Sequence, residues 1–378
     1  MVGSIGGSHH DPQLAAAVSS NEAADMITLD YSKLLGSPTE RREALGQLDH
    51  AFQTYGFIYL ANHSISQALF DEAFEWISPP SCPRFFDLES STKNLIARPL
   101  SSALEDHTGY AEYGVGHISQ LVFEDKEVET HQAASPDHKE TLEIGNPHEG
   151  PSSGTNRWLP EDIFPGFRKF YEVWWNACTE VEKSLRQALC AILDIEPDSL
   201  CRKQTLNFGH VSFLHYPAMV LQPQSGGEAR RLNAHTDYGV LTLVFQDAVG
   251  GLEVHDGHVF RPVIPKPGTI VVNLGDMLER QSNGRWKSAL HQVVAPRKET
   301  MQEGFVTAKA VLDRYSIAYT GAVDPEEIIE TLPGCEVPGR WKPSMADWDR
   351  EKPVTSYEWL QKRVAAEYFQ GSEGSNEG

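Results

Sequence analysis

His235 and Asp237 stand two residues apart in the segment His235-Thr236-Asp237, and His291 follows 56 residues after His235, in the segment SALHQVV. On a β-strand, residues i and i+2 point to the same face, so the side chains of His235 and Asp237 could reach one point. Two imidazole nitrogens and one carboxylate oxygen are ligands of first-row transition metals. The HxD segment is short, and in a chain with 15 histidines it could also arise by chance.

This ligand set would leave three positions of a bound metal open, which is typical of non-haem iron(II) oxygenases rather than of a closed structural zinc site. Arg314 and Ser316 form a second pair two residues apart, in the apolar segment RYSIAYT. A buried arginine is costly unless it meets an anion, and its planar fork suits a carboxylate. The serine hydroxyl, and that of Tyr216 on an earlier strand segment, would add donors. These residues favour a dicarboxylate ligand of the metal, although an ordinary ion pair of Arg314 is the alternative.

The segments that carry these residues resemble short strands separated by turns. Seven of them follow at close spacing between about residues 205 and 320, and Asp256-Gly257 between two apolar runs indicates a hairpin. Such spacing predicts a sandwich or a barrel. The segments are HVSFLHY, GVLTLVFQ, GGLEVHD, GHVFRPVI, GTIVVNL, SALHQVV and RYSIAYT.

The first half of the chain alternates short strands with helices. MITLDY and GFIYLANHSI predict strands, while apolar residues at helical spacing predict helices over 38–54, from Ser64 to about residue 77, and from Pro160 to about Ile195. Residues 96–160 show little periodicity. A further helix is expected from about Ser356.

The composition narrows the class of protein. The chain has 378 residues, with 53 acidic against 32 basic side chains and a net charge of −21, which argues against nucleic acid and anionic membrane surfaces as partners. No apolar run approaches the roughly 20 residues of a membrane span, and no secretory signal is evident. Five scattered cysteines fit a reducing compartment. We therefore expect a cytoplasmic protein with a small-molecule substrate, of open oligomeric state.

Longer motifs point to a family. AHTDYGVLTLVFQD, GGLEV, GTIVVNLGDMLERQSNGRWKSALHQVV and RYSIAY, in this order, closely resemble the iron(II)/2-oxoglutarate-dependent oxygenases of the isopenicillin N synthase-like class. GFIYLANHSI, KETLEIG and NRWLP extend the resemblance, which covers roughly residues 26–320. It implies a fold that is mainly β with surrounding helices, built on a double-stranded β-helix (jelly-roll) core. It also implies that iron(II) is bound by the catalytic ligands His235, Asp237 and His291, and 2-oxoglutarate by Arg314, Ser316 and Tyr216.

The resemblance also implies a division of the chain into regions. We expect a disordered tail over 1–25, a helical and mixed region over 26–200 that packs on the core, the jelly-roll core over 201–325, a C-terminal helical segment over 326–370 and a disordered tail over 371–378. The 23 residues from His291 to Arg314 are more than the family pattern requires and predict an inserted loop.

The implied activity is that of a dioxygenase, which consumes O2 and 2-oxoglutarate and releases succinate and CO2. It would hydroxylate, desaturate or cyclise a small organic metabolite, with secondary metabolism as the expected setting. Three alternatives remain: an iron oxidase of the same fold that does not use 2-oxoglutarate, a silent binding module and a zinc hydrolase. Leu214 replaces an Asn of many plant members. Candidate substrate residues are those that share the strand face of Tyr216, or lie in the loop over 109–119: Ser212, Leu214, His210, Tyr110 and Tyr113.

Overall fold

The computed structural model describes residues 19–78, 84–99, 108–115, 137–148, 156–206, 208–221, 230–295, 309–340 and 353–368. The tail expected over 371–378, and most of that over 1–25, lies outside these ranges. The segment expected as an inserted loop is described only at its two ends, and the loop over 109–119 only to residue 115.

The elements occur in a mixed order in the first half and as consecutive strands in the second. The helices are α1 (Tyr31–Leu34), α2 (Pro38–Thr54), α3 (Gln67–Glu75), α4 (Ser90–Lys93), α6 (Phe167–Ile192), α7 (Asp276–Gln281) and α8 (Ser356–Tyr368). The strands are β1 (Thr28–Asp30), β2 (Phe57–Ala61), β3 (Gly109–Ala111), β4 (Glu140–Gly145), β5 (Gly209–Tyr216), β6 (Met219–Leu221), β7 (Arg230–His235), β8 (Leu241–Gln246), β9 (Leu252–His255), β10 (Phe260–Pro262), β11 (Ile270–Leu274), β12 (His291–Val294), β13 (Lys309–Val311) and β14 (Arg314–Gly321).

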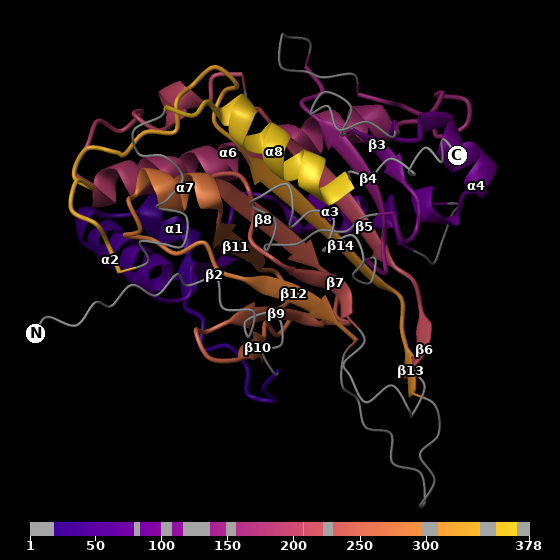
Figure 1. The fold of residues 1–378 in the computed structure, drawn as a ribbon, viewed down its shortest axis with the longest axis horizontal. Helices are drawn as coiled ribbons and strands as arrows, with labels where there is room; N and C mark the ends of the chain where they lie inside the picture. Colours follow the sequence, from indigo (N-terminus) through magenta and orange to yellow (C-terminus); the bar gives the residue numbers. More distant parts are fainter. Residues whose placement is uncertain are drawn as a thin grey trace, which may run out of the picture.

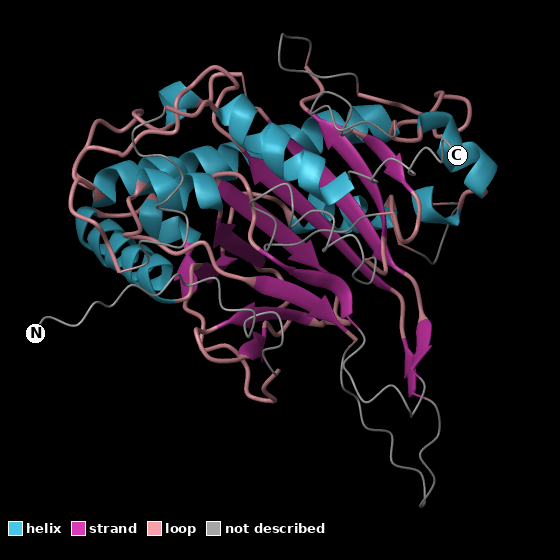
Figure 2. Ribbon diagram, in the orientation of Figure 1, coloured by secondary structure: helices cyan, strands magenta, loops and turns pink. Residues whose placement is uncertain are grey.

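Two facing sheets form the jelly-roll core, as predicted. The major sheet has the order β1-β2-β11-β8-β14-β5-β4-β3 and the minor sheet the order β10-β9-β12-β7, while β13 and β6 pair as a separate ribbon. Helices cover the outer face of the major sheet, with α6 along it (Figure 1, Figure 2). The fold is therefore mainly β with surrounding helices.

Alternation along β14 separates a helix-facing core from the interior between the sheets. Tyr319 packs edge-on against Trp175 of α6, with ring centroids 5.2 Å apart, and Ile317 is fully buried in the same cluster. Arg314 and Ser316, of opposite parity, face the interior instead. Period-2 alternation of polar and apolar residues on β14 thus places the polar face toward the site.

The predicted start is correct for one of three helices, α2, and wrong for α3 and α6. α2 spans the predicted residues because Ser37 and Glu40 form a reciprocal capping box. The expected start of α3 at Ser64 was wrong, because Ser66 accepts the capping hydrogen bond from Leu69 N. α6 begins at Phe167 rather than Pro160, because Gly166 adopts a φ of 82° that no helical residue has.

Several strands were not predicted from the sequence, among them β4 and the β6–β13 ribbon, and β7 was expected only around its last residue, His235. The Asp256-Gly257 hairpin was predicted correctly, since β9 and β10 pair with His255 opposite Phe260. Within the described ranges, no helix combines the length and the apolar character needed to cross a bilayer.

Candidate active site

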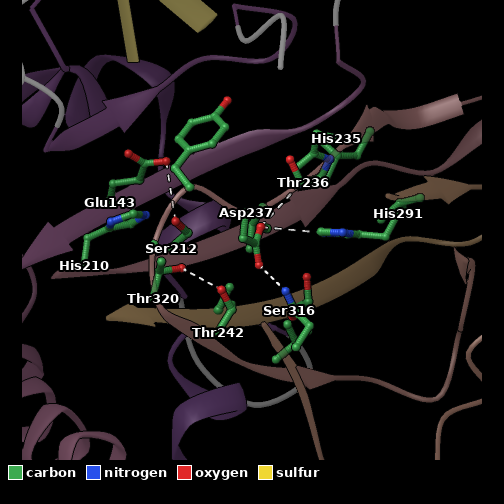
Figure 3. Close-up of a pocket in the computed structure, with 18 of the residues that line it drawn as sticks. Glu143, His210, Ser212, His235, Thr236, Asp237, Thr242, His291, Ser316 and Thr320 are labelled. Carbon is green, nitrogen blue, oxygen red and sulfur yellow. Dashed lines mark hydrogen bonds and ion pairs between the residues drawn. The ribbon is translucent and has the colours of Figure 1, made fainter. Parts of the chain in front are cut away.

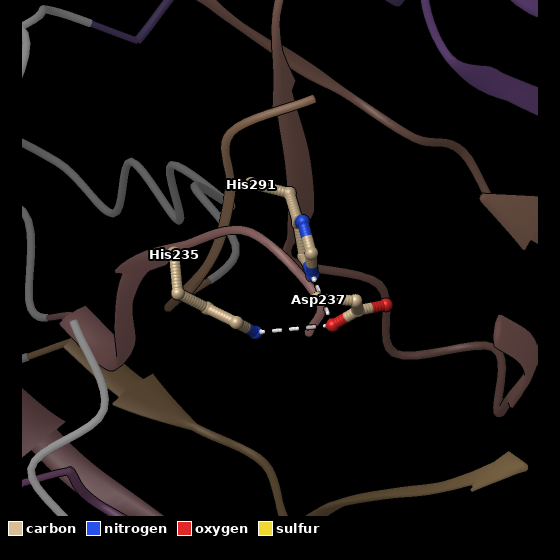
Figure 4. Close-up of side chains that lie close together, drawn as sticks. All are labelled: His235, Asp237 and His291. Carbon is tan, nitrogen blue, oxygen red and sulfur yellow. Dashed lines mark ion pairs between the residues drawn. The ribbon is translucent and has the colours of Figure 1, made fainter. Parts of the chain in front are cut away.

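Strand pairing brings the three candidate metal ligands together. His235 is the last residue of β7 and His291 the first of β12, and the two are directly paired across the antiparallel ladder. The prediction that His235 and Asp237 share one strand face was wrong: β7 ends at His235, and Asp237 lies in the turn that follows. That turn folds the carboxylate back toward the two imidazoles (Figure 4).

The three side chains converge on one point. Nε2 of His235 and Nε2 of His291 each lie 3.7 Å from Oδ1 of Asp237, and the two imidazole centroids are 4.2 Å apart. One ligand atom from each residue lies within 4.8 Å of the others. Atoms at these separations can surround a single metal ion, and the cavity on their other side leaves room for exogenous ligands.

Backbone carbonyls fix the tautomer of both histidines. Nδ1 of His235 donates to the carbonyl of Asn233 at 2.9 Å, and Nδ1 of His291 donates to that of Ala289 at 3.0 Å. A carbonyl can only accept, so the proton sits on Nδ1, and the lone pair of Nε2 faces the cavity. Burial, and then the neighbouring His291, lower the pKa of His235, which favours the neutral, metal-binding form. This donor set fits a divalent first-row metal.

Asn273 of β11 holds the carboxylate of this cluster. Its Nδ2 donates to Oδ2 of Asp237 at 2.5 Å, which leaves Oδ1 facing the histidines. Burial opposes ionisation of Asp237, but the adjacent His291 and His235, together with hydrogen bonds from Thr242 and Asn273, lower its pKa. Asn273 was not among the predicted site residues, although a lone amide within the apolar segment GTIVVNL is itself a signal, because a polar side chain facing a protein interior needs a partner.

The β5–β14 ladder builds a basic end of the cavity. Arg314 pairs with Tyr216 and Ser316 with Leu214, so their side chains share the inner face. Nη1 of Arg314 donates to Oγ of Ser316 at 3.0 Å, and its guanidinium carbon lies 4.8 Å from the Tyr216 ring centroid. Arg314 is 1% exposed, and its Nε has no hydrogen-bond partner within the described chain. A buried cation with an orphaned donor is suited to a ligand carboxylate.

The cavity between the sheets, of about 170 Å³, connects this basic end with the three candidate ligands. Of the candidate substrate residues, His210, Ser212 and Leu214 line it. Leu214 belongs to the Arg314 end, because it pairs with Ser316.

The structure brings neither Tyr110 nor Tyr113 into the cavity, which corrects the expectation for both. The hydroxyl of Tyr110 donates to Glu140 at 2.5 Å, on the outer side of the sheet. Tyr113 is half exposed and contacts His138. Other polar residues that line the cavity were not predicted, among them Glu143, Thr242 and Thr320 of β4, β8 and β14 (Figure 3).

The C-terminal helix α8 borders the cavity through Leu360. Nε1 of Trp359 donates to the carbonyl of Tyr238, immediately after Asp237, at 3.1 Å. Arg363 forms a buried ion pair with Asp276 at 2.8 Å. Through Trp359, α8 is attached to the same turn that carries the candidate ligand Asp237, and Figure 1 shows the helix lying across the strands of the core.

Two sequence models of protein families and several known proteins match this chain. A sequence model of the 2OG-Fe(II) oxygenase superfamily matches residues 208–321, and one described as non-haem dioxygenase in morphine synthesis N-terminal matches residues 28–161. The chain is 36% identical, over 91% of its length and 95% of the relative's, to the 2-oxoglutarate-dependent dioxygenase lolO1 of Epichloe uncinata. It is 31% identical, over 90% of its length and 96% of the relative's, to the 2-oxoglutarate-dependent dioxygenase frbA of Dothideomycetidae sp..

Among solved structures, the chain resembles a full-length protein of Neurospora crassa that was crystallised in complex with alpha-KG and thymine. The TM-score is 0.74 at 30% identity, and the match covers 93% of this chain and 99% of that one. A 2OG-Fe(II) oxygenase family protein from Caulobacter crescentus matches with a TM-score of 0.67 at 25% identity, over 90% of this chain and 98% of that one.

Proposed function

The chain belongs to the iron(II)/2-oxoglutarate-dependent oxygenases of the isopenicillin N synthase-like family, and from this we propose that His235, Asp237 and His291 are its iron ligands. The protein is an oxidoreductase, a dioxygenase that uses iron(II), 2-oxoglutarate and O2. One observation supports the ligand assignment above the others: two Nε2 atoms with fixed tautomers face the same oxygen of Asp237.

We further propose that Arg314, Ser316 and Tyr216 bind the carboxylate of 2-oxoglutarate that lies away from the metal. Arg314 and Ser316 occupy adjacent inward positions on β14, and the ladder sets Tyr216 directly opposite Arg314. A charge-assisted bond from a guanidinium to a carboxylate is among the strong hydrogen bonds, and burial strengthens it further. At the position of the family's Asn, Leu214 contributes apolar contact only.

Bound iron(II) and 2-oxoglutarate together supply the activation of O2, with 2-oxoglutarate converted to succinate and CO2. The chain's own residues orient the metal-binding side chains and exclude water from the cavity. Asn273 holds Asp237 in place, and the carbonyls of Asn233 and Ala289 hold the two imidazoles. Apolar side chains of the two sheets line the cavity: Leu214, Leu232, Val244, Leu252 and Val293.

The biological setting and the organisation of the chain are also proposals. Relatives include fungal dioxygenases and a proline hydroxylase, buaE of Petromyces alliaceus, which supports a small metabolite of fungal secondary metabolism as the substrate. The acidic composition supports the absence of nucleic-acid partners, and the five scattered cysteines support a reducing, cytoplasmic setting. We retain 201–325 as the catalytic core; strands β1 to β4, from the region 26–200, extend its major sheet, and α8 borders its cavity.

The decisive experiment is a count of succinate per product with purified protein, iron(II) and a metabolite panel. A ratio near one, with turnover dependent on 2-oxoglutarate, is the expected result. Product formed without 2-oxoglutarate or succinate would instead favour the iron oxidase of the same fold. Activity indifferent to O2 would favour a zinc hydrolase.

A further inference from the structure

The cavity has two ends of opposite character along the β5–β14 ladder. Arg314 and Tyr216 form one end, and four residues further along β14 the ladder reaches Ala318, which pairs with Ser212. Four residues of strand correspond to about 13 Å. Ser212 in turn pairs with Glu143 of β4, so a carboxylate stands at the end of the cavity away from Arg314.

Glu143 and Asp237 are the two carboxylates among the described residues that line the cavity, and Asp237 is committed to the metal cluster. Figure 3 shows Glu143, His210 and Ser212 grouped on one side of Asp237, with His291 on the other. Glu143 is 8% exposed. A carboxylate buried in this way is costly unless cations or hydrogen-bond donors face it, and Arg98 and Ser212 supply one of each.

Two neighbours of Glu143 hold its carboxylate at the border of the cavity. Nη1 of Arg98 lies 3.6 Å from Oε2, and Arg98 is not among the residues that line the cavity. Oε1 faces the cavity-lining Ser212, whose Oγ is 3.5 Å away. Arg98 therefore supports the carboxylate from behind, while the other oxygen is directed toward the space that a substrate would occupy.

Lys139 and Arg314, the lysine and arginine that line the cavity, each face an anion other than Glu143. Lys139 forms an ion pair with the buried Asp137 at 3.6 Å. Arg314, under the proposed function, faces 2-oxoglutarate. His210 adds no positive charge, because burial lowers its pKa and favours the neutral imidazole. The end at Glu143 is thus an acceptor site, bordered by the hydroxyls of Ser212 and Thr320.

We propose, on the basis of the proposed function, that Glu143 determines substrate class: the enzyme acts on a small amine whose ammonium group donates to Oε1 of Glu143. The two ends of the cavity then separate the two ligands by charge. 2-Oxoglutarate is attracted by Arg314 and repelled by Glu143, whereas an ammonium group is attracted by Glu143 and repelled by Arg314. The net charge of −21 further favours approach of cations to the protein.

The test uses the iron(II)–2-oxoglutarate complex of the full chain and matched six-membered rings: cyclohexylamine, cyclohexanol and cyclohexanecarboxylate. Binding is read from the change each compound causes in the visible absorption of that complex without oxygen, and turnover from succinate release with oxygen. We expect cyclohexylamine to bind at least roughly tenfold more tightly than either counterpart, as expected for a charge-assisted hydrogen bond. Piperidine, a secondary amine, should behave likewise.

Glu143→Gln keeps the shape and removes the charge, so the preference for the amine should fall to within about twofold. Glu143→Asp keeps the charge and should retain most of the preference, which separates a lost carboxylate from a disturbed fold. Glu112→Gln, the same change at an exposed position beside β3, is the matched control and should behave as wild type.

Failure of this proposal and of the proposed function give different results. If the wild type formed the iron(II)–2-oxoglutarate complex but bound the alcohol or the acid as well as the amines, or bound none of the compounds, amine recognition would be wrong. An unchanged preference in Glu143→Gln would equally overturn the role of Glu143. Absence of the iron(II)–2-oxoglutarate complex itself would instead count against the proposed function.

Discussion

Nδ2 of Asn273 lies 2.5 Å from Oδ2 of Asp237, so a hydrogen bond occupies one carboxylate oxygen while the other faces His235 and His291. Asn273 therefore decides which oxygen of Asp237 is presented to a metal. Such outer partners orient ligands and commonly change metal affinity by 10–100-fold when removed.

For Asn273→Ala we accordingly expect metal affinity to fall roughly 10–100-fold, because Asp237 loses its fixed rotamer. The affinity for 2-oxoglutarate at saturating metal should change little, because Asn273 does not border Arg314 in the ladder. Titrations of manganese(II), followed by 2-oxoglutarate, would measure both. A selective loss of 2-oxoglutarate binding with normal metal affinity would contradict this role.

Replacement of His235, Asp237 or His291 by Ala should each abolish turnover, because each supplies one of three protein ligands. The fold should survive, since the three side chains border a cavity rather than fill a core. Iron content, succinate release and thermal unfolding would be measured together. A variant with near wild-type rate and full iron loading would show that the replaced residue is not a ligand.

Arg314→Ala should weaken 2-oxoglutarate binding by about several hundred-fold or more, because loss of one partner from a buried charge pair costs roughly 3–5 kcal/mol. Arg314→Lys keeps the charge but not the fork, so part of the activity should remain. Iron occupancy, measured in parallel, should be normal in both variants. If the dependence on the organic substrate collapsed instead, Arg314 would be a substrate clamp.

Metal affinity should resist mild acid. Burial and His291 lower the pKa of His235 below its ordinary value of about 6.5, and the neutral form is the one that binds metal. The part of the affinity that depends on His235 is therefore complete above the lowered pKa and is lost as the pH falls through it. Manganese(II) titrations between pH 8 and pH 4 should show little change near pH 6.5, and a midpoint at that pH would contradict the prediction.

The attachment of α8 should keep water out of the cavity. Arg363→Ala removes the buried partner of Asp276, so α8 should detach more often and admit water beside Leu360. We expect more succinate per product, because 2-oxoglutarate is then consumed without substrate oxidation. Lys362→Ala, an exposed neighbour on the same helix, is the matched control. An unchanged ratio in Arg363→Ala would show that this ion pair does not govern coupling.

Strand periodicity was enough to predict the arrangement of β14, because RYSIAYT alternates polar and apolar residues and each parity packs against a different layer. It was not enough for the turn after β7. The approach of Asp237 to His291 depends on where β7 ends, and no spacing rule specifies that position. The jelly roll itself followed from ordered motifs rather than from periodicity.

The site residues that the sequence analysis missed are mainly single polar residues within strands. Glu143 and Asn273 have no partner at a motif spacing, since their neighbours come from other strands. The prediction for Tyr110 was wrong for a related reason. Strand β3, which carries Tyr110, was not predicted, so nothing indicated that its hydroxyl would contact Glu140 on the outer face of the sheet. In both cases the missing information was the pairing of distant strands.

The position of β2 constrains how this chain can fold. β2 pairs in parallel with β1 and antiparallel with β11, where Phe57 meets Asn273 more than 200 residues later in the chain. Closing so long a loop is slow, and during synthesis the apolar segment FIYLA must wait for most of the chain to appear. We therefore expect slow refolding, and aggregation of truncated chains that begin after β2, since their major sheet would expose the edge of β11 as an unpaired template.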